Sequence, residues 1–174
     1  YDIDCNDGQC TGLFYSRRIG RAPQLRNSFG DDASPLQTSI DGAAKITGRL
    51  GNGLSIGLLD AVTERVQGTQ SRTIEPLANY GVMRLQQDLR GGNSGVGVMV
   101  TNTTRQLDDW TRDVLRSGAL TGGFDMRHRF SQNRFQLSAQ LAGSRVTGSA
   151  AAIARTQRSN VHLYQREDAS HLAF

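Results

Sequence analysis

Several features that identify common classes of protein are missing from this chain of 174 residues. No stretch approaches the ~20 uninterrupted apolar residues of a membrane-spanning helix. The first residues, beginning at Tyr1, have neither the basic start nor the apolar stretch of a signal peptide. Position 1 is not methionine, so we expect a processed product or a fragment, with the fragment favoured. The length allows one ordinary domain or a slice of a larger one.

Lysine is nearly absent: Lys45 stands beside 19 arginines, against 16 acidic residues, which gives a net charge of +4. The arginines are scattered from Arg17 to Arg166 and form no block of one sign. Nucleic-acid-binding proteins usually cluster their basic residues, so the sequence argues against a nucleic-acid partner. Arginine suits places where a fixed planar donor pairs with a carboxylate or a phosphate.

Only two cysteines are present, Cys5 and Cys10, and they are close together. This spacing fits a small disulfide-bridged polar loop over residues 1–11 in an oxidising compartment. A zinc site would need two further ligands, and the three histidines are distant and irregularly spaced, so no metal site is expected.

What the chain does have is period-two alternation, which indicates β-strands with one apolar face. It is clearest at residues 119–130 and recurs at 40–50, 96–101 and 135–144. One parity is mostly apolar, comprising Ile40, Gly42, Ala44, Ile46, Gly48 and Leu50; Val96, Val98 and Val100; Leu120, Gly122, Phe124, Met126, His128 and Phe130; and Phe135, Leu137, Ala139, Leu141 and Gly143. The opposite parity is largely polar and carries most of the charges.

Two further segments, 53–64 and 74–87, alternate less cleanly because either parity places Asp60, Asn79 or Arg84 among apolar residues. A β-bulge in each would restore the pattern. Residues 12–19 and 160–166 complete about eight predicted strands, and residues 150–158 are compatible with one short helix. Residues 169–174 form a tail after the strands and loops of 12–168.

Short and long connections alternate along the chain. Tight turns are expected at residues 51–53, 91–94 and 131–133, where glycine, asparagine and serine favour hairpins. Longer polar stretches lie at 21–39, 65–72, 106–113 and 147–159. All the long loops therefore emerge at one end of an up-and-down sheet.

These features together are typical of an all-β, antiparallel up-and-down transmembrane β-barrel, with about eight strands present as part of a larger barrel. About 10 residues at ~3.3 Å each, tilted near 40°, rise ~25 Å, enough to cross a bacterial outer membrane. The apolar faces would contact lipid, and the lumen would hold Asp41, Lys45, Arg49, Asp125, Arg127 and Arg129. The alternative is a soluble barrel or sandwich, in which Phe124, Met126, Leu137 and Leu141 would pack together in a dry centre.

The sequence also resembles the barrel region of a bacterial family, domain of unknown function 5916, over roughly residues 10–168. The resemblance rests on several motifs in order: GLFYSRRIGR at 12–21, GAAKITGR at 42–49, GLSIGLLDAVTER at 53–65, LQQD at 85–88, RGGNS at 90–94, LAGS at 141–144 and ARTQRS at 154–159. It implies a Gram-negative outer-membrane protein with an N-terminal carbohydrate-binding-family-9-like domain and further strands outside this chain. It also implies membrane lipid and lipopolysaccharide as partners and a carbohydrate ligand. The family has no established catalytic residues to carry over.

Candidate binding residues come from the arginines. Arg17, Arg18 and Arg21 are grouped near the start of a predicted strand, where they could bind lipopolysaccharide phosphates or another anionic ligand through bidentate hydrogen bonds. Alternatively, they form a structural network with carboxylates such as Asp125 or Glu64. Arg127 and Arg129 alternate inward beside Asp125 and belong to the same kind of network.

No cofactor motif or catalytic arrangement is found. The glycines at 51–53 and 57 precede a strand rather than a helix, so they predict a hairpin and not a dinucleotide site. The acidic residues near Asp4 lack the closing glutamate of a calcium loop, since Leu13 stands at that position. His128 falls on an apolar face, where an interfacial aromatic is expected.

The sequence therefore predicts an outer-membrane barrel that anchors the protein and binds or passes a polar ligand. Two alternatives stay open: a glycan-active, hydrolase-associated domain, and a soluble arginine-rich domain that binds polyanions.

Overall fold

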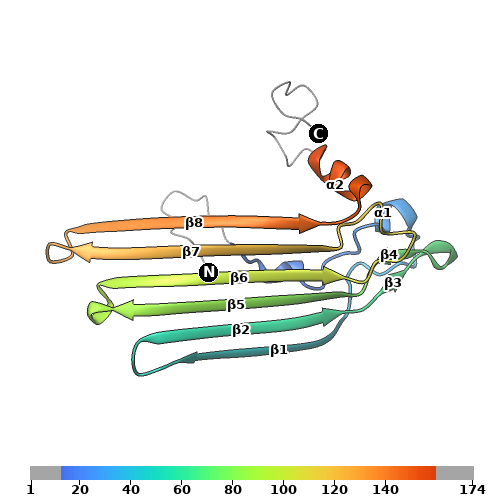
Figure 1. The fold of residues 1–174 in the computed structure, drawn as a ribbon. Helices are drawn as coiled ribbons and strands as arrows, with labels where there is room; N and C mark the ends of the chain where they lie inside the picture. The colour runs from blue at the N-terminus through green and yellow to red at the C-terminus, as the bar shows by residue number, and fades with distance from the viewer. Residues whose placement is uncertain (1–12, 160–174) are drawn as a thin grey trace, which may run out of the picture.

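A computed structural model describes residues 13–159, which form one long antiparallel sheet with its loops gathered at one end (Figure 1). The six strands lie in the order β1-β2-β5-β6-β7-β8, so each pairs with the next long strand in the sequence. Their bounds are β1 Ile40–Arg49, β2 Leu54–Thr63, β5 Ala78–Leu89, β6 Ser94–Arg105, β7 Gly118–Phe130 and β8 Phe135–Thr147. A separate small hairpin consists of β3 Val66–Gln67 and β4 Thr73–Glu75.

The predicted alternation of short and long connections is confirmed. Three tight turns join β1 to β2, β5 to β6 and β7 to β8 at the end that we call the turn end. The turn after β7 places Ser131, Gln132 and Asn133 in succession at positive φ, which serine and asparagine tolerate better than bulky residues. The opposite end, the loop end, carries the β3–β4 hairpin, the 106–117 loop, and the helices α1 Arg26–Phe29 and α2 Ala150–Gln157.

The predicted helix at 150–158 is confirmed as α2, whose N-terminus is capped by Ser149. The Ser149 side chain accepts a hydrogen bond from the backbone N–H of Ala152 at 3.2 Å. Such a cap satisfies one of the backbone donors that a helix leaves without an internal partner. No helix within residues 13–159 is long and apolar enough to cross a membrane.

The strand predicted at residues 12–19 is wrong over its described part, which contains a 3-10 turn, η1 Ser16–Arg18. The amide of Arg18 donates to Tyr15 O and that of Ile19 to Ser16 O, so the turn satisfies these amides locally and leaves them unavailable to a sheet. Gly20 follows at a φ of 75°, a left-handed conformation that glycine adopts without strain. The strand predicted at 160–166 lies outside the described residues.

The predicted bulges in the second and third long segments are also wrong. β2 and β5 pair without a register shift, and Asp60 stays on the apolar face, where the Asn79 side-chain amide donates to both of its carboxylate oxygens at 3.0 and 3.1 Å. A hydrogen-bonded pair thus takes the place of the bulge. The shift occurs instead in β1, between Ile40 and Gly42.

The bulge changes which face of the sheet the first residue of β1 occupies. Ile40 pairs with Thr63 and approaches Gly20, so it lies on the face opposite to Gly42, with which the simple alternation groups it. Asp41 is the extra residue of the bulge. The strict alternation that places Asp41 beside Lys45 in a lumen therefore does not hold at this residue.

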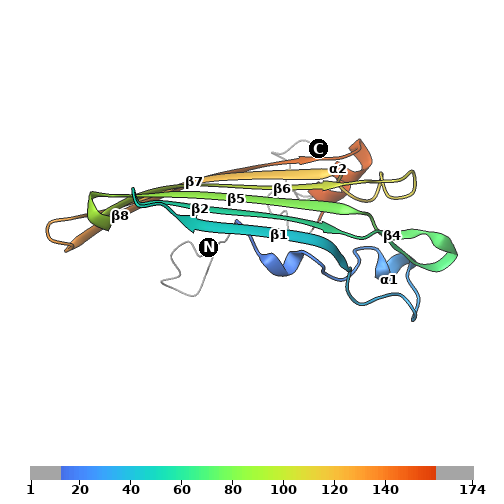
Figure 2. The same ribbon diagram turned by 90° about the horizontal axis from the view of Figure 1, so that it is seen from below.

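The two faces of the sheet differ in what covers them. The segment 13–39 lies against one face, which we call the inner face (Figure 2). Leu13 marks the contact, since a Cβ added to Gly123 of β7 would lie 2.3 Å from Leu13 Cδ1. On the outer face no described segment covers the strands, and many large apolar side chains are exposed there, namely Ile46, Leu58, Leu89, Val98, Leu120, Phe124, Phe130, Phe135, Leu137 and Leu141.

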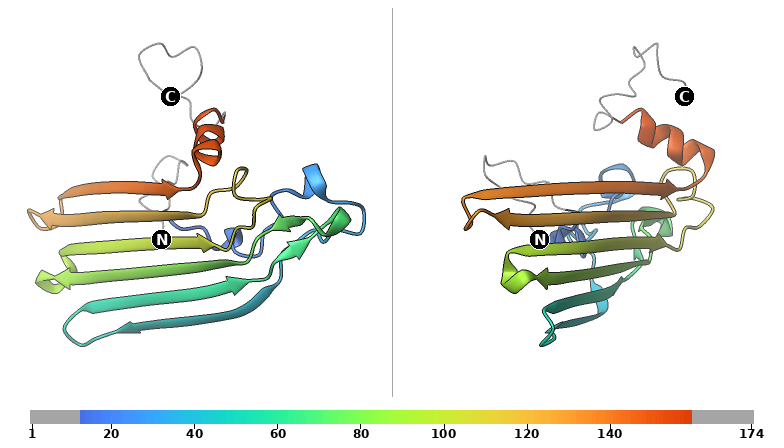
Figure 3. Two further views of the ribbon diagram at one scale, coloured as in Figure 1. Left: turned by 45° about the vertical axis from the view of Figure 1, so that its right-hand side comes forward. Right: turned by 60° about the vertical axis from the view of Figure 1, so that its left-hand side comes forward.

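The buried apolar cluster lies at the loop end rather than under the sheet. It consists of Leu25, Val66, Ile74 and Leu115, with Phe29, Leu107 and Val114 packed against it. Figure 3 shows the elements that contribute these residues gathered beyond the ends of the long strands. The cluster fixes the segment 13–39 to the loop end, because Leu25 belongs to that segment.

Aromatic, cation–π and hydrogen-bond contacts stabilise the same region. Trp110 packs edge-on against Phe29 with ring centroids 4.9 Å apart, and the Arg72 guanidinium lies 4.4 Å from the Trp110 ring. Asp108 accepts hydrogen bonds from Thr73 Oγ1 at 2.6 Å and from the Thr111 amide and hydroxyl at 2.9 and 2.7 Å. Burial raises the pKa of Asp108, but these hydrogen bonds outweigh it and the pKa lies below its ordinary value.

Candidate functional site

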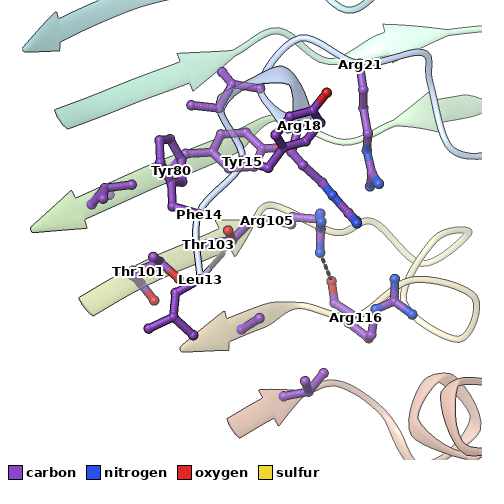
Figure 4. Close-up of a pocket in the computed structure, with 16 residues that line it drawn as sticks. Leu13, Phe14, Tyr15, Arg18, Arg21, Tyr80, Thr101, Thr103, Arg105 and Arg116 are labelled. Carbon is purple, nitrogen blue, oxygen red and sulfur yellow. Dashed lines mark hydrogen bonds between the residues drawn. The ribbon is translucent and has the colours of Figure 1, made fainter. Parts of the chain in front are cut away.

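A cavity of about 350 Å³ lies between the segment 13–39 and the inner face of the sheet, close to the loop end. Arginines surround it, and we call it the arginine cavity (Figure 4). It is lined by Leu13, Phe14, Tyr15, Arg18, Ile19, Arg21, Tyr80, Gly81, Val82, Thr101, Asn102, Thr103, Arg105, Arg116, Ala119 and Val146. Its volume falls in the range of small-molecule sites, about 300–1,000 Å³.

The four arginines come from separate parts of the fold. Arg18 ends the η1 turn, and the left-handed Gly20 turns the chain so that Arg21 faces the same cavity. Arg105 is the last residue of β6, and Arg116 lies in the loop before β7. Figure 4 shows all four guanidinium ends gathered on one side of the view.

Backbone and side-chain contacts hold the two sheet-side arginines. Arg105 Nη1 donates to the backbone oxygen of Arg116 at 3.1 Å, and Arg116 Nη1 donates to Thr156 Oγ1 of α2 at 3.1 Å. Each of these contacts uses one of the five N–H donors of a guanidinium. Donors therefore remain on both groups for a ligand.

The described residues that line the cavity give it a positive charge, because four of them are arginines and none of them is acidic. Burial lowers the pKa of Arg21, and Arg105 and Arg18 lower it further, while Glu75 and Tyr80 act in the opposite direction. Glu75 is nearly fully buried, and its carboxylate accepts hydrogen bonds from the backbone and side chain of Gln24. The Nε atoms of Arg21 and Arg105 are buried without a hydrogen-bond partner among the described residues.

Aromatic and hydroxyl groups complete the lining. Tyr15 and Tyr80 lie beside each other in Figure 4, away from the guanidinium ends, and Thr101 and Thr103 line the β6 side. Rings offer apolar surface with a polar tip, and threonine hydroxyls both donate and accept hydrogen bonds. The cavity thus combines a cationic side with a side that suits a less polar group.

Of the arginines predicted near the N-terminus, Arg18 and Arg21 line this cavity and Arg17 does not, although Arg17 and Arg18 are both exposed on the η1 turn. Arg18 and Arg21 are also not part of the alternative network with Asp125 or Glu64. Asp125 pairs elsewhere, and a Glu64 carboxylate oxygen accepts the backbone amide of Ser39 at 3.1 Å.

Lys45 and Arg49 lie on the same face of β1 but not in this cavity. Lys45 lines a second cavity of about 470 Å³ together with Tyr15, Arg84 and Met99. Arg49 Nη2 lies 2.7 Å from Asp88 Oδ2 in an exposed ion pair near the turn end. The structure therefore separates these two residues from the cluster at Arg18 and Arg21.

Asp125 forms an ion pair with Arg84 rather than with its neighbours on β7. Arg84 Nη2 donates to Asp125 Oδ1 at 2.9 Å, and Arg84 Nη1 donates to Asp125 Oδ2. Arg129 Nε donates to Gln136 Oε1 at 3.0 Å on the neighbouring strand β8. Arg127 shares the inner face, but no ion pair joins it to a carboxylate among residues 13–159, so its expected pairing with Asp125 is not observed.

Sequence reasoning misses Arg105, Arg116 and Arg84 as site residues. Arg105 and Arg116 are separated from Arg21 by about half of the chain, and no local pattern links them. The parity of Arg84 could have indicated its inward position, since the register places it opposite Gly57 and Met99 on the inner face.

Catalytic and metal-binding groups were not expected, and the described part of the chain contains no group of three or more His, Cys, Asp or Glu residues placed to hold a metal ion. His128 Nδ1 lies 2.8 Å from Ser94 Oγ on the outer face, and its ring stacks on Phe130 at 5.8 Å. The predicted disulfide between Cys5 and Cys10 lies outside the described residues.

Comparison with known proteins identifies the family of the chain. The family model described as Domain of unknown function (DUF5916) matches residues 9–169. The chain belongs to this family. No curated protein and no solved structure matches the chain. Within DUF5916, this chain provides an antiparallel sheet with an arginine-lined cavity on its covered face.

Proposed function

We propose that the chain forms part of the wall of a bacterial outer-membrane β-barrel, which anchors the protein and binds or passes a polar ligand along its inner face. The observation that carries the proposal is the difference between the two faces of one continuous sheet. The outer face is largely apolar and uncovered by any described segment, whereas the inner face carries most of the strands' charges and is covered by the segment 13–39.

The outer face has the amount of exposed apolar surface that contact with lipid requires. Phe124, Leu137 and Leu141 are 43%, 54% and 75% exposed. Such large contiguous apolar surfaces are rare on soluble monomers and mark interaction with a partner or a membrane. These residues do not pack together in a dry centre, which is the arrangement that the soluble alternative requires.

The apolar region has limits at both ends. Toward the loop end, the register aligns Asp60, Asn102 and Arg145 in one row across the outer face. Toward the turn end, the rings of Phe130 and Phe135 stack at 5.5 Å next to His128. Aromatic side chains are enriched at membrane–water interfaces, so this stack suits the periplasmic boundary, where the turns of outer-membrane barrels are short.

The strand lengths support a lipid-spanning role. The six long strands contain 10 to 13 residues each. Tilted strands of about 10 residues span the ~25 Å apolar band of the outer membrane. Closure of the barrel requires β1 and β8 to pair with strands beyond the six described, because unpaired backbone groups in hydrocarbon cost several kcal/mol each.

The inner face supports passage or binding of a polar ligand. It carries Lys45, Arg84, Asp125 and Arg127 along the strands and the arginine cavity near the loop end. In this proposal the loop end faces the outside of the cell. A carbohydrate is one polar ligand that such a surface could take.

Site-directed labelling of the full chain in lipid vesicles tests the proposal. Phe124→Cys and Leu137→Cys report the outer face, and Thr121→Cys and Ser138→Cys are their matched inner-face controls, all on a background in which Cys5 and Cys10 are serine. We expect an environment-sensitive dye to be quenched by brominated lipid only at the two outer positions, and a water-soluble maleimide to react faster at the two inner positions. Equal behaviour of both faces would contradict a membrane location.

A further inference from the structure

We propose that the arginine cavity is a binding site for a small organic anion that carries a carboxylate or phosphate group. This inference deepens the ligand-binding part of the proposed function by naming the chemical class of the ligand. The membrane location is a separate matter, because the cavity is defined by contacts on the inner face alone.

The first argument is charge. Arg18, Arg21, Arg105 and Arg116 line one cavity, and none of the residues among 13–159 that line it is acidic. Bringing cations together in a partly buried space is unfavourable unless an opposite charge compensates them. Glu75, which lies outside the lining, compensates part of the charge at Arg21, and a bound carboxylate or phosphate would compensate the rest.

The second argument is the supply of hydrogen-bond donors. The Nε atoms of Arg21 and Arg105 are buried without a partner among residues 13–159. A buried donor without a partner is costly, and native proteins usually satisfy such groups. These Nε atoms have almost no exposed surface, so a ligand that pairs with them must shift the two side chains. The Nε and one Nη of a guanidinium could then bind two oxygens of one oxyanion.

The third argument concerns the rest of the ligand. Tyr15, Tyr80 and Val82 line the cavity on the side away from the guanidinium ends, and Thr101 and Thr103 add hydroxyls. A bare inorganic ion would leave this surface unused. A ring or short carbon skeleton attached to the anionic group would cover it, which favours an organic anion.

The site is built from two parts of the chain, which gives the ligand a structural effect. Arg18 and Arg21 belong to the segment 13–39, whereas Arg105 and Arg116 belong to the sheet and its loop. An anion between them replaces repulsion across the boundary with attraction on both sides. Binding is therefore expected to hold the segment more firmly against the inner face.

Calorimetric titration of the purified full chain in detergent tests the proposal with four probes. Glucuronate and glucose 6-phosphate carry a carboxylate and a phosphate, respectively, on the same kind of sugar ring. Glucose is the neutral control, and inorganic phosphate is the anion without an organic part. We expect one or both of the charged sugars to bind at least tenfold more tightly than glucose and than inorganic phosphate. Glucose binding as tightly as both charged sugars, or no binding by either, would overturn the anion site. If inorganic phosphate binds as tightly as the charged sugars, the proposed contact between the cavity and the organic part of the ligand is wrong.

Variants locate the binding in this cavity. Arg21→Gln and Arg105→Gln should each weaken the charged sugar at least tenfold, whereas Arg90→Gln, in the exposed turn between β5 and β6, should leave it unchanged. Arg21→Lys keeps the charge but loses the bidentate geometry, so we expect an intermediate affinity. Unchanged affinity in both glutamine variants, with folding verified by circular dichroism, would overturn the proposal. Vesicle labelling tests the membrane location independently, so either proposal can fail while the other stands.

Discussion

Arg84 on β5 and Asp125 on β7 form a bidentate ion pair that crosses the intervening strand β6 above Gly97. A Cβ added to Gly97 would lie 2.3 Å from Arg84 Nη2, so glycine at this position leaves the space that the guanidinium occupies. The arginine and aspartate side chains are 14% and 24% exposed, which means that water screens the pair only in part. The pair thus ties three neighbouring strands together.

Gly97→Val should displace the Arg84 guanidinium from Asp125. We expect the free energy of unfolding to fall by about 1.5–3 kcal/mol, because hydrogen bonds to charged groups contribute on that scale. Urea titration of the full chain measures the change. Gly122→Val, on the outer face of β7 where an added Cβ meets nothing within 4 Å, is the matched control and should have little effect. Equal losses in the two variants would show that valine acts through the strand backbone and not through the ion pair.

Gly123→Val should weaken the contact of the segment 13–39 with the inner face, since Leu13 occupies the space above this glycine. Trypsin cleaves after arginine, and Arg17 and Arg18 lie in that segment. We expect cleavage there to become several times faster in the variant, as judged by the fragments on a gel. Gly122→Val again serves as control, because the adjacent residue faces the other way. Cleavage that stays at the wild-type rate in Gly123→Val would mean that Leu13 does not hold the segment.

Acid should loosen the loop end through Asp108, whose pKa lies below its ordinary value. A carboxylate with a lowered pKa in the folded state stabilises that state above its unfolded pKa, about 4, and loses the effect as the pH falls through the folded value. The fluorescence of Trp110, the only tryptophan in the chain, should therefore change below about pH 4. In Asp108→Asn the change should already be present at neutral pH and should depend less on acid. Asp109→Asn is the control, since its exposed carboxylate pairs with Arg112 on the surface. An identical acid response in wild type and Asp108→Asn would contradict the assignment.

Leu141→Arg should reduce insertion into vesicles if the outer face meets lipid. Leu141 pairs with Phe124 near the middle of the apolar region, and arginine at the bilayer midplane costs roughly 2–4 kcal/mol. Gln140→Arg, one residue away on the inner face, should insert like wild type. The folded fraction after mixing with vesicles is measured by heat-dependent migration on a gel. A soluble sheet would give the same result for both variants.

The strands and tight turns were predictable from sequence because their signals are local. The alternation in residues 119–130 is visible in neighbouring side chains, and three consecutive residues, 131–133, predict the turn that follows it. The sequence does not predict the small hairpin β3–β4, because its strands are only two and three residues long. β3 lies within the stretch expected as a loop, and β4 overlaps the start of the next predicted strand segment. The bulge at Asp41 left no clear signal, since the glycine and alanines that follow it carry little amphipathic contrast.

Only two of the four arginines in the arginine cavity could be grouped from the sequence. Arg18 and Arg21 are close in sequence, so their grouping is visible without a structure. Arg105 and Arg116 join them because the sheet register and the loop-end cluster bring β6 and the following loop beside the N-terminal segment. Single-sequence patterns report neighbours along a strand, and they do not report which segment lies across its face.

The position of Leu13 against Gly123 also sets an order of events during folding. The N-terminal segment is synthesised first, yet the surface that receives it does not exist until β7 has paired with its neighbours. Contacts between residues so distant in sequence form late, because closing the intervening chain costs entropy before any contact repays it. The segment 13–39 is therefore made before the strands that it lies on, yet it is among the last described parts of the chain to reach its native position.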